Sequence, residues 1–128
     1  MVFSVVMGLQ WLGIMSLTIG RRRSGGVEIL DIGGRLTLGD STGMLREAVK
    51  KTADAELDVL LNLAGVVYVD SAGLGELVGS FASASAKGRR MKLLNPPKRV
   101  DSLLQTTKLY STFECFSDER QAIASFAQ

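Results

Sequence analysis

The sequence predicts one α/β domain, a mixed β-sheet with about four helices largely on one of its faces. Strand-like runs come first, and strand-like and helix-like segments then alternate along the chain. Within Val66–Phe81 the apolar pattern changes from an unbroken run to the spacing i, i+3, i+4, i+7, which indicates a buried strand followed by a helix. With 128 residues, 46% of them apolar, the chain is long enough to bury the core of one domain.

Residues 1–14 form an apolar, uncharged leader that we expect to lie outside the fold, so that a single domain covers 15–128. Met15 is a second possible start, because it opens directly on a strand-like segment. The uncharged run extends to Gly20 and precedes Arg21–Arg23, which also fits a membrane anchor through residues 1–20. Polar residues and glycines interrupt this run, and its basic residues follow it, unlike those of a cleavable signal.

Two strand-like runs come next, Val27–Ile32 and Arg35–Leu38. Gly33-Gly34 lies between them and is suited to a tight hairpin. Asp40 or Ser41 then caps the first predicted helix. One face of this helix comprises Leu45, Ala48, Val49 and Thr52.

The middle of the chain is expected to form a β-α-β unit with a right-handed crossover. Its first strand is Val59–Leu63, which continues toward a buried run at Val66–Val69. Gly88 ends the helix that follows, and Met91–Leu94 is the next buried strand. The apolar face of that helix comprises Leu74, Leu77, Val78 and Phe81.

The last third of the chain predicts two further helices and one strand. Asn95-Pro96-Pro97 starts a helix, because proline fits the first turn, where its missing N–H costs nothing. The buried stripe of this helix comprises Val100, Leu103, Leu104 and Thr107. Phe113–Phe116 is a short strand, and Ser117 or Asp118 caps the last helix. The apolar residues of the last helix are Ala122, Ile123 and Phe126.

The hexapeptide Asp-Ser-Ala-Gly-Leu-Gly at residues 70–75 joins the buried strand to the helix. It resembles the signature of the STAS family of anti-sigma-factor antagonists, Asp-Ser-(Ser/Ala)-Gly-Leu-Gly in the same setting. The resemblance covers Met15 to Phe126 and implies the STAS fold. Its further marks are Gly34-Arg35-Leu36, Leu61-Asn62-Leu63 and Met91-Lys92-Leu93-Leu94-Asn95.

The resemblance implies a protein-binding switch and no enzymatic activity. In this family the serine that matches Ser71 is phosphorylated by a partner, an anti-sigma factor with serine kinase activity. The unphosphorylated form binds that partner and frees a sigma factor, and a separate serine phosphatase resets the switch. The family further implies a cytoplasmic protein, without cofactor or metal, that is a monomer or weak homodimer and contacts neither nucleic acid nor membrane directly.

The implied partner-binding residues are Asp70, Ser71, Ala72, Gly73, Leu74, Asp40, Ser41 and Thr42. In this family the loop that matches residues 40–42 lies beside the phosphorylated serine. The chain departs from the family at Thr37, where many antagonists carry an acid. A partner contact made by that carboxylate is therefore in question for this protein.

The residues around Ser71 are suited to accept a phosphoryl group. A serine at a helix N-terminus is accessible, and a dianion there is stabilised by the helix dipole and free N–H groups. Asp70 either caps the helix or orients the hydroxyl. Gly73 and Gly75 keep the turn small, so that a kinase can approach the backbone closely. On this local pattern alone, the interpretation of Ser71 as only a helix cap is favoured, because helix caps are far commoner than phosphorylation sites.

Several classes of enzyme are excluded by residues that the sequence lacks. There is no histidine, which removes Ser-His-Asp and Cys-His catalysis. A nucleophile elbow would need glycine where Val69 stands, and no G-x-x-x-x-G-K-[ST] phosphate loop occurs.

The single cysteine, Cys115, cannot form an internal disulfide and is expected to be a buried thiol. Seven basic residues between Lys87 and Lys108 are interpreted as an ordinary solvated edge, because no aromatic residue is interleaved among them.

Two other functions remain open on the sequence alone. The chain could be a STAS subunit that regulates a membrane transporter, for example a lipid-trafficking ABC complex. The apolar leader favours this alternative, whereas the intact Asp-Ser-Ala-Gly-Leu-Gly turn favours the sigma-factor pathway. It could also be an enzyme that binds a small ligand or nucleotide at the glycine-containing turn. That enzyme would have a pocket with converging polar groups near Gly73.

Overall fold

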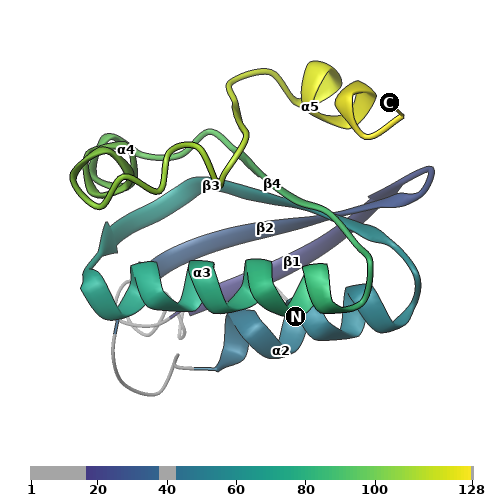
Figure 1. The fold of residues 1–128 in the computed structure, drawn as a ribbon, viewed down its shortest axis with the longest axis horizontal. Helices are drawn as coiled ribbons and strands as arrows, with labels where there is room; N and C mark the ends of the chain where they lie inside the picture. The colour runs from purple at the N-terminus through teal and green to yellow at the C-terminus, as the bar shows by residue number, and fades with distance from the viewer. Residues whose placement is uncertain (1–16, 38–42, 128) are drawn as a thin grey trace, which may run out of the picture.

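The computed structural model describes residues 17–37 and 43–127 (Figure 1). The leader at residues 1–14 and the predicted site residues Asp40, Ser41 and Thr42 lie outside this described part. The strands are β1 (Leu17–Ser24), β2 (Val27–Leu36), β3 (Asp58–Val69), β4 (Met91–Leu94) and β5 (Cys115–Phe116). The helices are α2 (Met44–Asp54), α3 (Ser71–Ala86), α4 (Lys98–Thr106) and α5 (Glu119–Ser125).

The five strands form one mixed sheet in the order β1-β2-β3-β4-β5. β1 is antiparallel to β2, whereas β2, β3, β4 and β5 run parallel to one another. The predicted fold class is confirmed, including the β3-α3-β4 unit of two parallel strands joined by a helix. Arg21–Arg23, which would flank a membrane anchor at residues 1–20, lies within the edge strand β1.

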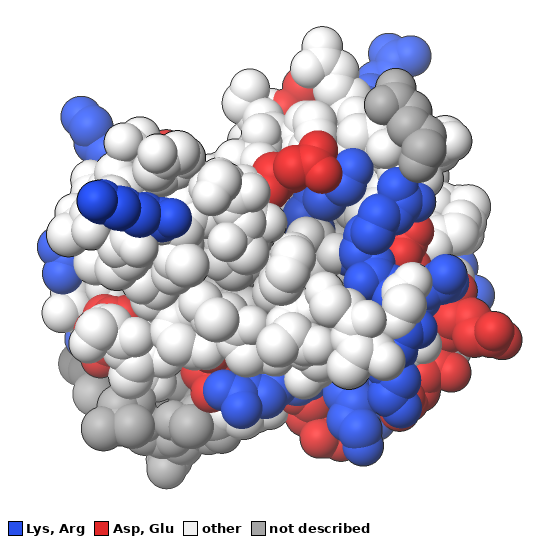
Figure 2. Space-filling view, in the orientation of Figure 1, with Lys and Arg blue, Asp and Glu red and all other residues white. Residues whose placement is uncertain are grey.

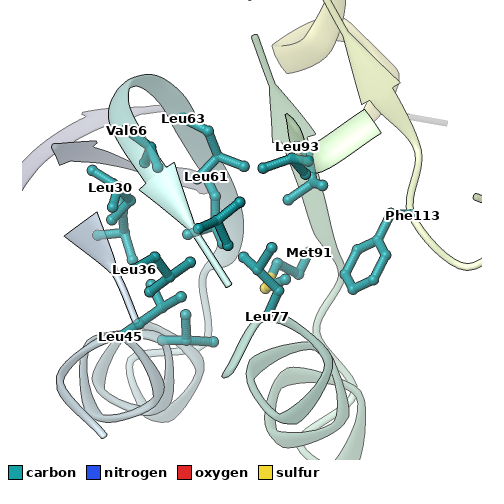
Figure 3. Packing of buried hydrophobic residues seen from close by; sticks show 14 of the residues in the cluster. Leu30, Leu36, Leu45, Leu61, Leu63, Val66, Leu77, Met91, Leu93 and Phe113 are labelled. Atoms are coloured by element: carbon teal, nitrogen blue, oxygen red, sulfur yellow. The ribbon is translucent and has the colours of Figure 1, made fainter. Parts of the chain in front are cut away.

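The main core lies between one face of the sheet and the helices α2 and α3, which run side by side beneath it (Figures 1 and 3). Helix α4 and Phe113 contribute to the same core. Helix α5 instead covers the opposite face, because β2, β3 and β4 are apolar on both faces. This second cluster comprises Val27, Ile29, Leu60, Leu94, Ala122 and Phe126.

The predicted hairpin at Gly33-Gly34 is wrong, because both glycines lie inside the continuous strand β2. The hairpin turn is Gly25-Gly26, between the paired residues Ser24 and Val27. The pairing register between β2 and β3 shifts on both sides of Gly33-Gly34, and Gly34 has a positive φ of 89°. Glycine is therefore needed there for an irregularity within the strand, which looks like a turn in the sequence.

Two other expectations about the helices differ from the structure. Helix α2 begins at Met44 with Gly43 as its N-cap residue, after the predicted caps Asp40 and Ser41, which are not among the described residues. Thr107, predicted to be buried, is exposed just beyond α4, where its hydroxyl donates to the Leu103 carbonyl at 2.6 Å. The predicted cap of the last helix is confirmed, because the Asp118 carboxylate accepts the N–H of Gln121 at 2.9 Å.

Cys115 is exposed in β5 and is not the buried residue that the sequence predicted. β5 contains only two residues, so little of the chain covers Cys115 on this outermost strand. Partial burial, with the nearby charge of Asp101, still raises the pKa of the thiol. The thiol is therefore protonated at neutral pH, when it is a poor nucleophile.

Ser80 lies on the buried side of α3, and its hydroxyl has no hydrogen-bond partner among the described residues. A buried, unpaired hydroxyl is unfavourable, and alanine is the better helix former. We therefore expect Ser80→Ala to raise the free energy of unfolding by about 1 kcal/mol, as measured by urea unfolding. A loss of stability would show that the hydroxyl has a favourable contact in solution.

Arg22 of β1 ties the sheet to α5 through two carboxylates. Its guanidinium donates to Asp31 at 2.7 and 2.9 Å and to Glu119 at 2.8 and 3.0 Å. These hydrogen bonds lower the pKa of both Asp31 and Glu119. The stability that they contribute is thus present above the ordinary carboxyl pKa values and is lost as the pH falls through the lowered ones.

Arg22→Met should therefore destabilise the protein by about 1 kcal/mol at neutral pH, a small effect because these groups are more than one third exposed. The difference from the unchanged protein should shrink as the pH falls below about 4. Urea unfolding of both proteins across this range measures it. A difference that is constant with pH would contradict the role of the two carboxylates.

Candidate functional site

The predicted phosphorylation site lies at the junction of β3 and α3, where Asp70 caps the helix. Its backbone is extended, and its carboxylate accepts the N–H of Gly73 at 2.8 Å. Its carbonyl accepts the N–H of Leu74 at 2.9 Å, which is the first hydrogen bond of the helix. Of the two roles predicted for Asp70, capping is the one that these contacts confirm.

Ser71 is the first residue of α3 and is exposed. Asp70 and Ala72 beside it are half-buried, so these three residues form the accessible part of the turn. Gly73 and Leu74, which the family resemblance placed in the partner surface, are buried in the domain. They shape the turn from inside and do not present a side chain to a partner.

Gly73 packs directly against the end of β2. A Cβ at this position would overlap the Leu36 carbonyl oxygen and lie 2.7 Å from its carbon and 2.9 Å from Cγ2 of Val69. Gly75 is exposed, and a Cβ there would meet no atom within 4 Å. The absence of a side chain is thus required at Gly73 for packing of the helix on the sheet. Packing does not explain the glycine at position 75, so there the predicted close approach of a kinase to the backbone remains a possible reason.

The last residues of β3 are more exposed than their apolar run predicted. Val67 is 69% exposed and Tyr68 43% exposed, because β4 pairs only with the first part of β3, up to Asn62. The Arg35 guanidinium lies over the Tyr68 ring, 4.6 Å from its centre. These residues adjoin the Ser71 turn but were not recognised in the sequence, because an unbroken apolar run is typical of a buried strand.

Glu76, in the second turn of α3, was not among the site residues predicted from the sequence. It is buried, and its carboxylate accepts the backbone N–H of Gly43 and a guanidinium N–H of Arg46, both at 3.0 Å. The sequence did carry one sign that this residue is special, because Glu76 is the single charged residue of α3 and lies among apolar residues. Its partners lie in α2 and its cap, about thirty residues earlier, so the spacing could not identify them.

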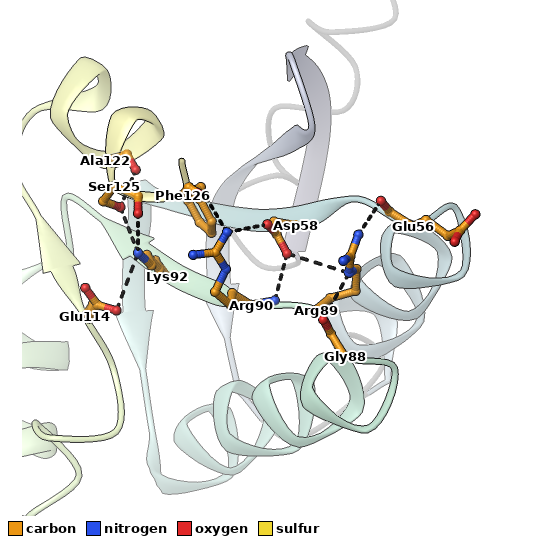
Figure 4. Close-up of polar contacts among 10 residues, drawn as sticks. All are labelled: Glu56, Asp58, Gly88, Arg89, Arg90, Lys92, Glu114, Ala122, Ser125 and Phe126. Carbon is orange, nitrogen blue, oxygen red and sulfur yellow. Dashed lines mark hydrogen bonds and ion pairs between the residues drawn. The ribbon is translucent and has the colours of Figure 1, made fainter. Parts of the chain in front are cut away.

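The basic segment between Lys87 and Lys108 does not form a continuous cationic surface. On the face shown in Figure 2, acidic and basic side chains are interspersed. Several of its cations are paired within the domain, as Figure 4 shows for Arg90 with Asp58 at 3.1 Å and Lys92 with Glu114 at 3.5 Å. Lys87 pairs with Asp54 at 2.6 Å. These contacts favour the interpretation of the basic segment as an ordinary solvated edge, and not as a surface that binds nucleic acid.

The alternative of a ligand-binding enzyme predicts a pocket near Gly73. A surface hollow of about 400 Å³ lies beyond β4 and β5, and no residue of the Ser71 turn lines it. Its lining comprises Asn95, Pro96, Asp101, Cys115, Phe116 and Ser117. Within residues 17–37 and 43–127, no group of three or more acidic or cysteine side chains is placed to hold a metal ion. No helix in the same part of the chain has the length and apolar character needed to span a membrane.

Comparison with known proteins gives the family. The model of the STAS domain matches residues 19–122, which include most of β1, all of β2 to β5 and the Ser71 turn. The chain belongs to the STAS domain family. The recognition made from the hexapeptide at residues 70–75 is thereby confirmed.

This STAS domain is similar to the anti-sigma-B factor antagonist of Bacillus subtilis (strain 168), with 36% identity over 69 residues. The match covers 54% of this chain and 63% of that protein's length, so it spans less than two thirds of the relative.

Solved structures share the fold at lower identity. An anti-sigma factor antagonist from Mycobacterium paratuberculosis has a TM-score of 0.73 and 16% identity, over 88% of this chain and 95% of that one. The Bacillus cell fate determinant SpoIIAA in its phosphorylated form has a TM-score of 0.67 and 18% identity, over 85% of this chain and 99% of that one. These likenesses establish the STAS fold.

Proposed function

We propose that this STAS domain is an anti-sigma-factor antagonist controlled by phosphorylation of Ser71. With a free hydroxyl it binds and sequesters an anti-sigma factor that is also a serine kinase, and thereby frees a sigma factor. The kinase transfers the terminal phosphoryl group of ATP to the Ser71 Oγ, which loses its proton, and ADP leaves. The bulky dianion then weakens the complex, and a serine phosphatase removes it by hydrolysis.

The observation that carries this proposal is the position of Ser71, exposed as the first residue of α3. The neighbouring Asp70 already caps the helix, so the Ser71 hydroxyl is not needed as its cap. A phosphoryl group there would lie at the positive end of the helix dipole, where its negative charge is stabilised. The similarity to a named anti-sigma-B factor antagonist supports the same role.

The domain would act as acceptor and docking surface in the cytoplasm and would need no catalytic group, cofactor or metal of its own. Its partner surface would comprise Asp70, Ser71 and Ala72, together with the loop at residues 40–42. We propose a monomer or weak homodimer in solution.

The test is to capture the native partner with the full chain, and to incubate the purified partner and the chain with Mg²⁺ and ATP. Mass spectrometry should find one phosphoryl group on Ser71 and none on the Ser71→Ala variant, which should still bind. Phosphate at another residue only, or capture of a permease and its ATPase in place of a kinase, would contradict the proposal.

We also propose that residues 1–14 are dispensable, in line with the family match at 19–122. A chain that starts at Met15 should unfold in urea with a free energy within about 0.5 kcal/mol of the full chain. A loss of several kcal/mol would place the leader in the fold. Sedimentation of only the full chain with membrane vesicles would support the anchor instead.

A further inference from the structure

Glu76 makes contacts that tie the start of α2 to the helix that carries Ser71. Its side chain is 9% exposed, and its two oxygens accept from different parts of α2. Oε2 accepts the backbone N–H of Gly43 at 3.0 Å, and Oε1 pairs with Nη2 of Arg46 at 3.0 Å. A carboxylate this buried is stable only with such partners, so α2 and α3 are held at a defined separation here.

The contact with Gly43 supplies a capping hydrogen bond that, among the described residues, comes from no side chain of α2 itself. Gly43 is the N-cap residue, with a φ of 90° and no side chain to accept a hydrogen bond. In a capping box, a glutamate three residues into the helix accepts the N–H of the N-cap residue. That position in α2 is Arg46, and the carboxylate is supplied instead by Glu76 of the neighbouring helix.

The position of Arg46 is determined further by Gly79, one turn beyond Glu76 on α3. A Cβ on Gly79 would lie 2.5 Å from Cζ and 2.6 Å from Nε of Arg46, so the guanidinium occupies the space that a side chain would fill. Gly79 has no positive φ that would require glycine. The space over Gly79 therefore accommodates the arginine that pairs with Glu76.

Both helices begin near the carboxyl ends of the parallel strands, because α2 follows β2 and α3 follows β3 (Figure 1). The first turn of α2 exposes Met44, an apolar side chain that is 42% exposed. The first turn of α3 exposes Ser71. A protein that docks on the Ser71 turn can therefore contact the start of α2 as well.

We propose that Glu76 is a positioning residue, which holds the first turn of α2 beside the Ser71 turn so that both form one surface for the kinase partner. This inference rests on the proposed function. It adds that recognition depends on a buried carboxylate that the partner does not touch.

The test measures steady-state phosphorylation of the full chain by the captured serine kinase with Mg²⁺ and ATP. Glu76→Gln keeps the size of the side chain but removes its charge and the ion pair with Arg46. We expect its KM to rise about five- to tenfold, with kcat within about twofold of the original, because Ser71 itself is unchanged. Glu76→Asp, which keeps a carboxylate at this position, should have a KM between those of Glu76→Gln and the original protein.

Two further variants separate positioning from general stability. Asp54→Asn breaks the ion pair with Lys87, which joins the same two helices at their far ends, and should leave KM unchanged. Gly79→Ala should displace the Arg46 guanidinium and raise KM. Alanine favours the helix, which offsets part of the stability lost with the ion pair.

The outcomes separate the two proposals. If the unchanged protein is not phosphorylated on Ser71, the proposed function fails and this inference fails with it. If Ser71 is phosphorylated but Glu76→Gln and Gly79→Ala leave KM unchanged, only the inference is overturned. An equal rise of KM for Asp54→Asn would also overturn it, since any loss of helix contact would then suffice.

Discussion

Replacing Gly73 by alanine should destabilise the protein by about 3 kcal/mol or more, although only one methyl group is added. The new Cβ would overlap the backbone carbonyl of Leu36, which cannot rotate away as a side chain can. The N-terminus of α3 would have to move away from the end of β2, and the Ser71 turn would move with it. Urea unfolding measures the loss, which is a large part of the stability of a domain of this size.

Gly75→Ala is the matched control, because it adds the same methyl group two residues later in the same helix. Its Cβ meets no atom within 4 Å. Since alanine is the better helix former, this variant should be as stable as the original or more stable by up to about 1 kcal/mol. Equal effects of the two substitutions would show that Gly73 is not packed against Leu36 as described.

Ser71→Asp should reduce affinity for the proposed kinase partner by about tenfold or more and leave the fold intact. An acidic side chain in the first turn of α3 interacts favourably with the helix dipole, so the free energy of unfolding should be unchanged or slightly higher. A partner surface matched to a neutral serine must instead desolvate and oppose the new charge. Isothermal titration with the captured kinase measures the affinity. Aspartate carries less charge than a phosphoryl group, so the phosphorylated protein should bind more weakly still.

Ser85→Asp is the control for charge alone, because Ser85 is exposed near the other end of α3, about 20 Å along the helix. It should bind as the original protein does. If both aspartate variants bind equally weakly, the effect comes from net charge. If Ser71→Asp binds with unchanged affinity, Ser71 is not the switch.

The sequence by itself determined the features that depend on residues close together in the chain. The change from an apolar run to helical spacing located the junction of β3 and α3, and thereby Ser71. The caps Asp70 and Asp118 were each one of two alternatives that the sequence offered, and they could be found there because each accepts an N–H only three residues away. The hexapeptide at residues 70–75 identified the family for the same reason, as a motif that is contiguous in the sequence.

Only the tertiary structure decided which of two glycine pairs forms the hairpin. Gly25-Gly26 and Gly33-Gly34 are equally good local turn signals, but pairing with β1 and β3 carries the chain straight through the second pair. It also decided that Gly73 is buried against Leu36 and that Glu76 supplies the N-cap contact of α2. These contacts join residues more than thirty positions apart, which become neighbours only when the helices pack on the sheet, so no local pattern encodes them.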